Sequence, residues 1–343
     1  MKIKVAINGF GRIGRAIARL IFEKPEFSNF QLVAINASAD AKTLKHLLSF
    51  DSIHGIFGCE VLANEQELII KNQSIKLINQ RDPAMLPWQD LGVDLVFECT
   101  GAFTSLEDAS KHLLAGAKKV IISAPAKESK DAKNLVKTIV YGVNHNQLNA
   151  DDKVISIGSC TTNCLAPIAN ILHQKLGIVK GLMTTIHAYT NDQNIVDNTH
   201  KDLRRARAAA MSMIPTSTGA AKALSLVVPE LKGRLDGVAI RVPTPNVSMV
   251  DLNFVASRHT SIEEINKIIS DEVKASAVLQ RVVQVVVEPL VSIDFNHSEY
   301  SSCFDTTQTK VLQNDFVKVA SWYDNEWAFS VRMLDVAKIF AIN

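Results

Sequence analysis

The first half of the chain alternates short apolar runs with stretches that have helical spacing. In Arg12–Glu23 the apolar residues recur three or four positions apart, which is the spacing of a helix with one buried side. Further helices are predicted over Ala41–Ser49 and Leu106–Ala115, and strands over Lys4–Asn8, Gln31–Asn36, Leu95–Glu98, Lys119–Ser123 and within the alternating run Glu67–Leu77. This alternation of strand and helix predicts a doubly wound parallel sheet.

The second half has longer strand-like runs. Strands are predicted over Gly181–His187, Val238–Val242, Val247–Ala256 and Phe316–Tyr323, and helices over Ala166–Leu176, Ile262–Val273 and Val331–Ile342. Thr260-Ser261-Ile262-Glu263 is interpreted as a capping box that opens the second of these helices. Long strands with helices beside them predict an α+β domain with a largely antiparallel sheet.

These patterns predict an α/β chain of two domains, which suits its 343 residues at about 100–200 residues per domain. A dinucleotide-binding domain is expected over residues 1–158 and a catalytic domain over residues 159–330. The C-terminal helix, residues 331–343, is expected to pack back onto the first domain.

Composition narrows the class of protein. A formal net charge of +2 is too small to predict nucleic acid or a membrane surface as the main partner. No run approaches the roughly 18 apolar residues of a membrane-spanning helix, and the first apolar run is interrupted by Asn8 and Gly9, so no signal peptide is expected. Five sparse cysteines do not suggest a disulfide framework, so a reduced, cytoplasmic protein is expected.

The segment from Gly9 to Gly14 is a GxGxxG motif between a predicted strand and a predicted helix, which is the context that dinucleotide binding requires. Gly9 permits a tight turn, Gly11 lets the backbone approach a pyrophosphate, and Gly14 lets helix and strand pack closely. The pyrophosphate would lie at the helix N-terminus, where free N–H groups point outward.

The end of the second strand bears on cofactor choice. Enzymes that prefer NAD carry a carboxylate there for the ribose 2′-hydroxyl, but this strand ends Asn36-Ala37-Ser38. Ala37 removes a charge that would repel a 2′-phosphate, and Ser38 can donate a hydrogen bond to that phosphate. Asp40 lies nearby, but further round a turn. We therefore favour NADP over NAD, with the alternative that Ala37 only weakens NAD binding.

Cys160 lies in Ser159-Cys160-Thr161-Thr162-Asn163-Cys164, between the apolar strand Val154–Ile157 and an apolar helix. A thiol near a helix N-terminus is expected to have a lowered pKa and to act as a nucleophile. His187, at the end of an apolar run, is the candidate base, although a lone histidine is more often structural. No spacing of cysteines or histidines suggests a metal site.

A basic cluster, Lys201–Arg207, precedes Pro215–Ala220 and Arg241. A solvated face is the ordinary interpretation of such a charge run. Guanidinium groups beside hydroxyls and a glycine N–H also suit an oxyanion such as phosphate.

Together these segments resemble the glyceraldehyde-3-phosphate dehydrogenase family over essentially the whole chain. The resemblance rests on Ala6–Gly14, Ser159–Cys164, Thr184–Gln193, His200–Ala210, Pro215–Lys222, Arg241–Asn246 and Trp322–Trp327. It implies a cytoplasmic homotetramer that oxidises glyceraldehyde 3-phosphate with NAD or NADP and inorganic phosphate.

The resemblance also implies residue roles. Cys160 would be the nucleophile and His187 the general base. The substrate phosphate would be held by Thr190 and Arg241, and the attacking phosphate by Ser159, Thr161, Arg205, Thr218 and Gly219. The cofactor would be bound by Gly9, Gly11, Arg12, Ile13, Ala37, Ser38, Arg81, Ser123, Thr199 and Asn325.

The chain departs from the family's commonest pattern at four places. Ala37 replaces an aspartate and Asn198-Thr199 replaces Leu-Pro, and both changes resemble NADP-using members. Lys127–Lys137 is longer than usual and is interpreted as a surface excursion. Ala328-Phe329 replaces Gly-Tyr near the nicotinamide.

Two other functions stay open on the sequence. Val291–His297 and Thr306–Thr309 resemble erythrose-4-phosphate dehydrogenases, which hydrolyse the thioester instead of phosphorylating it. Pro215–Lys222 and His187–Thr190 do not, and these segments would contact substrate. A nucleic-acid-binding or receptor-binding protein on the same fold is a further alternative, which the small net charge does not favour.

Overall fold

The structure, a computed structural model, describes residues 2–127 and 135–342. The chain divides into two compact units, Met1–Ile139 with Asn146–Gly158 and Ser330–Asn343, and Val140–His145 with Ser159–Phe329. One division falls after Gly158, and the last helix groups with the first unit from Ser330 onwards. The sequence pattern did not indicate that Val140–His145 belongs with the second unit. The expected surface excursion at Lys127–Lys137 lies mostly outside the described residues.

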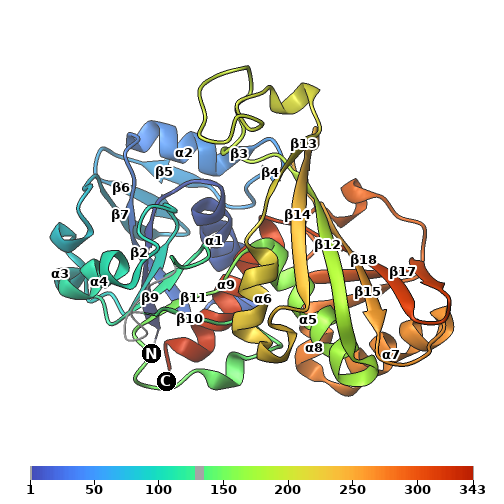
Figure 1. The fold of residues 1–343 in the computed structure, drawn as a ribbon. Coiled ribbons are helices and arrows are strands. Elements are labelled where there is room, and N and C mark those ends of the chain that lie inside the picture. The colour runs from blue at the N-terminus through green and yellow to red at the C-terminus, as the bar shows by residue number, and fades with distance from the viewer. Residues whose placement is uncertain (1, 128–134, 343) are drawn as a thin grey trace. The chain divides into compact units, whose positions relative to one another are not determined.

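The first unit is built on a nine-stranded sheet with the order β10-β11-β9-β8-β1-β2-β7-β6-β5 (Figure 1). Its strands are β1 (Ile3–Asn8), β2 (Phe30–Asn36), β5 (Val61–Ala63), β6 (Glu67–Ile70), β7 (Gln73–Ile78), β8 (Leu95–Glu98), β9 (Lys119–Ile122), β10 (Lys137–Thr138) and β11 (Val154–Ser156). From β7 to β11 the strands are parallel and follow the 3-2-1-4-5-6 order of a dinucleotide-binding sheet. The predicted doubly wound sheet is therefore confirmed.

Helices of this unit follow the strands as the spacing predicts. They are α1 (Arg12–Glu23), α2 (Ala41–Ser49), α3 (Trp88–Leu91), α4 (Leu106–Leu114) and the greater part of α9 (Trp327–Phe340), and a small hairpin pairs β3 (Phe50–Asp51) with β4 (Gly55–Ile56). The alternating run Glu67–Leu77 is a hairpin of β6 and β7. It turns at Lys71 and Asn72, whose φ angles of 47° and 62° are unusual outside glycine. No glycine marks the turn, so the apolar pattern alone did not locate it.

The second unit is built on a seven-stranded sheet with the order β13-β14-β12-β15-β18-β17-β16. Its strands are β12 (Ile178–Ala188), β13 (Ile214–Ser217), β14 (Leu235–Val242), β15 (Ser248–Ala256), β16 (Val283–Val286), β17 (Ser302–Leu312) and β18 (Phe316–Tyr323). Four of its pairings are antiparallel, and β12–β14 and β16–β17 are parallel. The expectation of a largely antiparallel sheet is confirmed.

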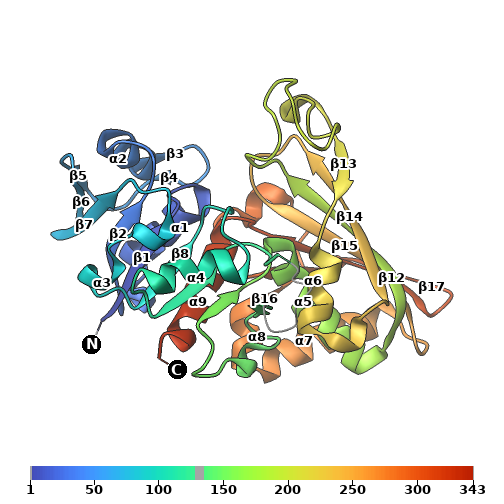
Figure 2. The same cartoon turned by 60° about the vertical axis from the view of Figure 1, so that its left-hand side comes forward.

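Helices cover one face of this second sheet (Figure 2). They are α5 (Cys160–Leu176), α6 (Ala220–Val227), α7 (Ile262–Ala275) and α8 (Ala277–Val282). Apolar side chains such as Leu165, Leu172 and Ile269 form a shared core with Leu252 and Phe254 of β15. The packing of α5 in this core fixes the position of its N-terminus against the sheet.

Two helix starts and one N-cap differ from the prediction. Helix α5 begins at Cys160 instead of Ala166, because Ser159 caps it at that point. The prediction missed this start because the polar residues of the first turn do not show the apolar spacing of a helix. The N-cap of α7 is Ser261 instead of Thr260, since Ser261 Oγ accepts from the N–H of Glu264 at 3.2 Å. Helix α9 begins at Trp327, four residues before the predicted Val331. No helix among the described residues is long and apolar enough to cross a bilayer.

Candidate active site

Cys160 is the first residue of α5, and its side chain meets His187 from β12. The sulfur lies 3.5 Å from Nε2 of His187. The preceding residue, Ser159, is the N-cap, and its Oγ accepts from the N–H of Thr162 at 3.1 Å. The first N–H groups of a helix have no partner within the helix and carry partial positive charge. The thiol therefore lies beside both an imidazole and a positively polarised helix end.

The other ring nitrogen of His187 has two neighbours. Nδ1 lies 2.7 Å from the carbonyl oxygen of Ala188 and 2.8 Å from Nη1 of Arg241. If Nδ1 carries the hydrogen it donates to Ala188, and the lone pair of Nε2 then faces the sulfur. If Arg241 donates to Nδ1, the hydrogen lies on Nε2 instead. A general base towards Cys160 requires the first of these two tautomers.

Burial dominates the electrostatics of this pair. Burial, together with the charges of Arg241 and Arg205, lowers the pKa of His187 to about 3, although the hydrogen bond to Ala188 acts in the opposite direction. Burial also raises the pKa of Cys160, although Arg241 and the N–H and hydroxyl of Thr161 act in the opposite direction. The expected lowering of the Cys160 pKa by the helix end is therefore wrong, because desolvation is the larger effect. A neutral thiol faces a neutral imidazole at neutral pH.

Tyr323 joins these elements, although the sequence analysis gave it no role. Its buried hydroxyl lies 2.9 Å from Oγ1 of Thr161 and 2.8 Å from Oγ1 of Thr185. Its ring packs edge-on against His187, with 6.0 Å between the ring centroids. The available signal was its place at a buried position of β18 within the Trp322–Trp327 motif.

Asn325 is linked to the same site through Ser248. The Ser248 hydroxyl donates to Oδ1 of Asn325 at 2.9 Å and accepts from the N–H of Ala188 at 3.0 Å. Thr190 lies just beyond β12, and its N–H donates to Oε1 of Gln193 at 2.8 Å. The segment around His187 is therefore linked through Ala188 and Ser248 to Asn325, while Thr190 is held by Gln193.

Arg205 points towards the end of β13, close to the start of α6. Its Nε donates to Oγ1 of Thr216 at 2.9 Å, its Nη2 donates to the carbonyl oxygen of Ser217 at 3.2 Å, and its Nη1 pairs with Asp192. Asp192 is a further residue that the sequence analysis missed.

The neighbouring residues predicted to bind phosphate are Thr218 and Gly219. Thr218 Oγ1 accepts from the N–H of Ala220 at 3.2 Å. Gly219 is the N-cap of α6, with open space where a side chain would lie. These positions bring a guanidinium group, a hydroxyl and a helix N-terminus into one segment of the second unit.

In the first unit, the glycines of the GxGxxG motif fit a dinucleotide. Gly9 has a φ of 94°, and a Cβ there would lie 2.7 Å from the backbone nitrogen of Thr100. A Cβ on Gly14 would lie 2.3 Å from the carbonyl oxygen of Gly9. Gly11 faces open space, as the approach of a pyrophosphate requires. The backbone N–H groups of Arg12 and Ile13 are in the first turn of α1.

The side chains predicted to bind cofactor differ in how they are held. The Arg12 guanidinium forms a two-point pair with Asp51, and its charge helps to hold the pKa of that carboxyl well below its ordinary value against the effect of burial. Ser123 is held by its N–H, which donates to the carbonyl oxygen of Glu98 at 2.9 Å. Ser38, Arg81 and Thr199 are exposed and Ala37 is half-buried. Thr199 and Asn325 belong to the second unit, and the other predicted cofactor residues belong to the first.

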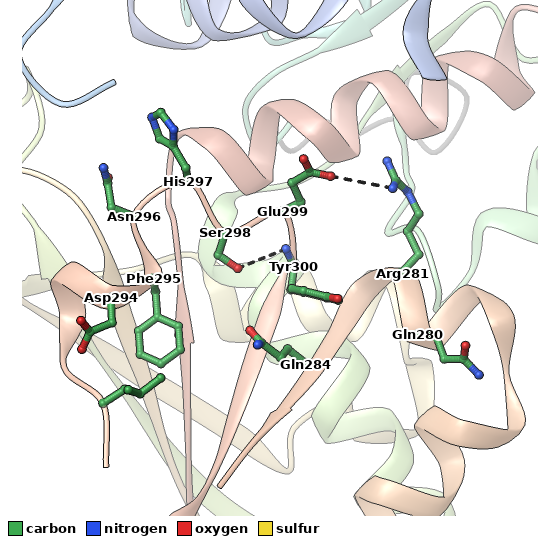
Figure 3. A pocket seen from close by; sticks show the side chains of 11 residues that line it. Gln280, Arg281, Gln284, Asp294, Phe295, Asn296, His297, Ser298, Glu299 and Tyr300 are labelled. Atoms are coloured by element: carbon green, nitrogen blue, oxygen red, sulfur yellow. Dashed lines mark hydrogen bonds and ion pairs between the residues drawn. The ribbon is translucent and has the colours of Figure 1, made fainter. Parts of the chain in front are cut away.

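The second unit also contains a cavity of about 510 Å³ near the ends of α8 and β16 (Figure 3). Arg281 and Glu299 point towards each other in it, with 3.9 Å between Nη1 and Oε2. None of the predicted site residues lines this cavity. Among the described residues, no group of three His, Cys, Asp or Glu side chains is arranged to hold a metal ion.

Comparison with known proteins agrees with this geometry. Residues 3–106 match the family described as "Glyceraldehyde 3-phosphate dehydrogenase, NAD binding domain", and residues 159–325 match its "C-terminal domain". The chain is 56% identical over 341 residues to "Glyceraldehyde-3-phosphate dehydrogenase, plasmid" of Cupriavidus necator, with 99% of each chain covered. It is 53% identical over 337 residues to the Zymomonas mobilis glyceraldehyde-3-phosphate dehydrogenase, with 98% of each covered, and 52% identical over 341 residues to that of Pseudomonas aeruginosa, with 99% of each covered. The chain therefore belongs to the glyceraldehyde-3-phosphate dehydrogenase family.

Proposed function

We propose that this protein is a phosphorylating glyceraldehyde-3-phosphate dehydrogenase. It converts glyceraldehyde 3-phosphate, inorganic phosphate and NAD(P)⁺ into 1,3-bisphosphoglycerate and NAD(P)H, reversibly, as a step of glycolysis or gluconeogenesis. The observation that carries the proposal is the contact of 3.5 Å between the Cys160 sulfur and Nε2 of His187 at the start of α5. A nucleophile within reach of an oriented base is the arrangement that covalent catalysis needs.

The first step forms a thiohemiacetal. The Cys160 sulfur bonds to the aldehyde carbon, and His187 relays the thiol proton to the carbonyl oxygen. A neutral imidazole, which the low pKa of His187 ensures, is able to accept that proton. His187 then takes the hydroxyl proton as the substrate carbon loses a hydride, which leaves a thioester on Cys160. The bound nicotinamide supplies the acceptor for that hydride.

The second step transfers the acyl group. A phosphate oxygen attacks the thioester carbon, the bond to sulfur breaks, and His187 returns its proton to Cys160. We assign this phosphate to Ser159, Thr161, Arg205, Thr218 and Gly219. The position of Arg205 supports the assignment, since its guanidinium lies against Thr216 and Ser217, directly before Thr218 and Gly219, and a guanidinium suits phosphate.

We assign the substrate's own phosphate to Thr190 and Arg241. The half-buried Arg241 has a buried Nε without a hydrogen-bond partner among the described residues. A buried donor without a partner costs free energy, and a bound oxyanion would remove that cost. A substrate phosphate at this position would also place the aldehyde within reach of His187.

For the cofactor we propose a preference for NADP over NAD. Ala37 occupies the position at which a carboxylate would exclude a 2′-phosphate, and Ser38 beside it is exposed. Asp40 is engaged elsewhere, since its carboxylate caps α2 by accepting from the N–H of Thr43 at 2.7 Å. Thr199 is proposed to add a further hydroxyl towards the 2′-phosphate, and Asn325 to hold the nicotinamide amide.

We further propose that the enzyme is a cytoplasmic homotetramer. The face of the second sheet opposite its helices exposes apolar side chains, with Leu182 on β12 66% exposed and Val238 on β14 52% exposed. Exposed apolar faces of this kind are typical of surfaces that another chain covers. The five cysteines are all free thiols, which supports a reducing compartment. Light scattering coupled to gel filtration would give the mass of the assembly.

A steady-state assay with glyceraldehyde 3-phosphate tests the activity, with NAD⁺ and NADP⁺ compared in the presence and absence of inorganic phosphate. We expect a rate that requires phosphate and is higher with NADP⁺. A rate that is indifferent to phosphate, with erythrose 4-phosphate as the better substrate, would instead assign thioester hydrolysis to the site.

A further inference from the structure

A network of buried polar side chains joins three neighbouring strand ends in the first unit. Asn8 ends β1 and lies opposite Glu98, which ends β8. Asn8 Nδ2 donates to Oε2 of Glu98 at 2.5 Å, and Nδ2 of Asn36, at the end of β2, donates to Oδ1 of Asn8 at 2.6 Å. Glu98 is fully buried. The carboxyl edge of the sheet is therefore held together by side chains as well as by its backbone ladder.

Glu98 accepts hydrogen bonds at both oxygens. Oε2 accepts from Asn8 and lies 3.0 Å from Nε2 of His112, and Oε1 accepts from the N–H of Thr100 at 2.7 Å and from its hydroxyl. An ionised carboxylate offers about four acceptor positions, which this set of donors fills. A buried carboxylate is costly unless it is hydrogen-bonded in this way.

Trp88 determines which ring nitrogen of His112 carries the hydrogen that is donated to this carboxylate. The indole nitrogen of Trp88 lies 3.0 Å from Nδ1 of His112, and both side chains are fully buried. Because an indole N–H can only donate, Nδ1 of His112 accepts and its hydrogen lies on Nε2. The ring therefore donates to Glu98, and the order of donors runs from Trp88 through His112 to the carboxylate.

This network supports the glycine loop directly. Gly9 lies against Thr100, whose N–H and hydroxyl both bind Glu98. The N–H of Gly9 donates to the carbonyl oxygen of Asn36 at 2.9 Å, and the N–H of Ser123 donates to the carbonyl oxygen of Glu98 at 2.9 Å. Gly9 and Ser123, which are both assigned to the cofactor site, therefore donate hydrogen bonds to the backbone of two network residues.

We propose that Glu98 is a positioning residue for dinucleotide binding, and that His112 and Trp88 hold its carboxylate in place. The inference rests on the proposed function, because it requires a nicotinamide dinucleotide at this edge. Glu98 and Asn8 lie between β8 and β1, where the strand order reverses and ligands of such sheets bind. A loop that is already ordered loses less conformational entropy when the ligand arrives, so Glu98 acts through affinity and not through the chemistry on Cys160.

Glu98→Gln in the full-length protein tests the proposal, with NADH and NADPH binding measured by calorimetry. The amide keeps the shape of the side chain but turns one of the two acceptor oxygens into a donor that faces other donors. We expect the dissociation constant to rise by about tenfold or more, equivalent to about 1.4 kcal/mol or more, because the glycine loop is less ordered before the dinucleotide binds. The turnover number at saturating cofactor and the alkylation rate of Cys160 without cofactor should change far less than the affinity.

Lys119→Met is the matched control for stability. Lys119 begins β9 at the opposite edge of the same sheet, where its Nζ donates to the carbonyl oxygen of Phe340 at 2.6 Å. Its loss should lower the unfolding temperature and leave cofactor affinity unchanged. If this variant weakens cofactor binding as much as Glu98→Gln does at an equal loss of stability, Glu98 is only structural and the proposal is wrong.

Trp88→Phe provides a milder variant should Glu98→Gln not fold. It removes the N–H that orients His112 and retains an aromatic ring. We expect an increase of about threefold in the dissociation constant, which is a smaller effect than the loss of a full hydrogen bond would have. Wild-type affinity in this variant would overturn the role of Trp88 and His112. Failure of the proposed function is distinguished separately, because it would appear in the wild-type protein as an absence of nicotinamide dinucleotide binding.

Discussion

Nη1 of Arg241 lies 2.8 Å from Nδ1 of His187, because the two residues are direct partners in the parallel register of β12 and β14. The charge of Arg241 lowers the pKa of His187 and also acts to lower that of Cys160. An anion bound to Arg241 would offset this charge and make His187 more basic. If the substrate phosphate binds Arg241 as proposed, one guanidinium group would couple substrate binding to activation of the base.

Replacement of Arg241 by methionine tests this coupling. We expect KM for glyceraldehyde 3-phosphate to rise by about 10- to 100-fold, which corresponds to the loss of a charge-assisted hydrogen bond of roughly 1.5–3 kcal/mol. The pH midpoint for alkylation of Cys160 by iodoacetamide should also rise, because the thiolate loses a favourable charge. Arg204→Met is the control, since Arg204 is an exposed arginine of the basic cluster Lys201–Arg207 and its side chain bonds only weakly to the carbonyl oxygen of Pro215 at 3.4 Å. An unchanged midpoint in Arg241→Met would contradict the coupling.

Cys160→Ser tests the nucleophile. Serine matches cysteine in shape, so α5 should keep its cap at Ser159 and the protein should fold normally. A hydroxyl is far less nucleophilic than a thiol beside a neutral imidazole, so turnover should fall by about a thousandfold or more. The dissociation constant for NADPH should stay at the wild-type value. Activity near that of the wild type would refute a thioester on this residue.

The low pKa of His187 makes the stability of the protein depend on pH. A buried histidine with a pKa of about 3 resists protonation in the folded state, whereas the unfolded chain takes up a proton below about pH 6.5. Stability is therefore complete above this pH and is lost as the pH falls towards the folded value. Relative to His187→Asn, the wild type should lose about 1.4 kcal/mol per pH unit in this window. Urea unfolding of both proteins at neutral and acid pH measures the difference, and parallel pH curves would show that His187 does not contribute.

Tyr323→Phe isolates the hydroxyl that links α5 to β12. The substitution leaves Thr161 and Thr185 without their shared partner, at 2.9 and 2.8 Å in the native protein. We expect a loss of about 1–3 kcal/mol in the free energy of unfolding. Turnover should fall as well, because Thr161, which lies next to Cys160, loses its hydrogen-bond partner, whereas the ring contact with His187 is retained. Wild-type stability and turnover in this variant would show that the hydroxyl bridge is dispensable.

The architecture of the first unit was largely predictable from local pattern. Arg12–Glu23 and Ala41–Ser49 have clear apolar spacing, and both helices begin and end at the predicted residues. Short elements were missed because they carry too few residues to show a period, as in the four-residue α3 and the two-residue β10. The start of α5 was missed because its first turn is polar.

The site was predictable in its residue types but not in its geometry. Cys160 and His187 were identified by motif, whereas the contact between them depends on the packing of α5 against a sheet whose strand order no local pattern reveals. The place of Arg241 beside His187 follows from the β12–β14 register, and that of Tyr323 from the burial of alternate residues in β18. The net direction of the Cys160 pKa depends on the degree of burial, which sequence spacing does not measure.

Ala37→Asp tests the proposed basis of cofactor preference. The N–H of Ala37 donates to the carbonyl oxygen of Ile78 at 2.9 Å, so a new carboxylate would be held at the end of β2, where it can accept from a ribose 2′-hydroxyl and repel a 2′-phosphate. We expect the ratio of kcat/KM for NADP⁺ to that for NAD⁺ to fall by about tenfold or more, equivalent to about 1.4 kcal/mol or more. Asp40→Asn is the matched control. It removes a nearby charge and leaves a side chain that can still cap α2, so the ratio should change little. If the ratio is unchanged in Ala37→Asp, or shifts equally in Asp40→Asn, residue 37 does not discriminate between the two cofactors.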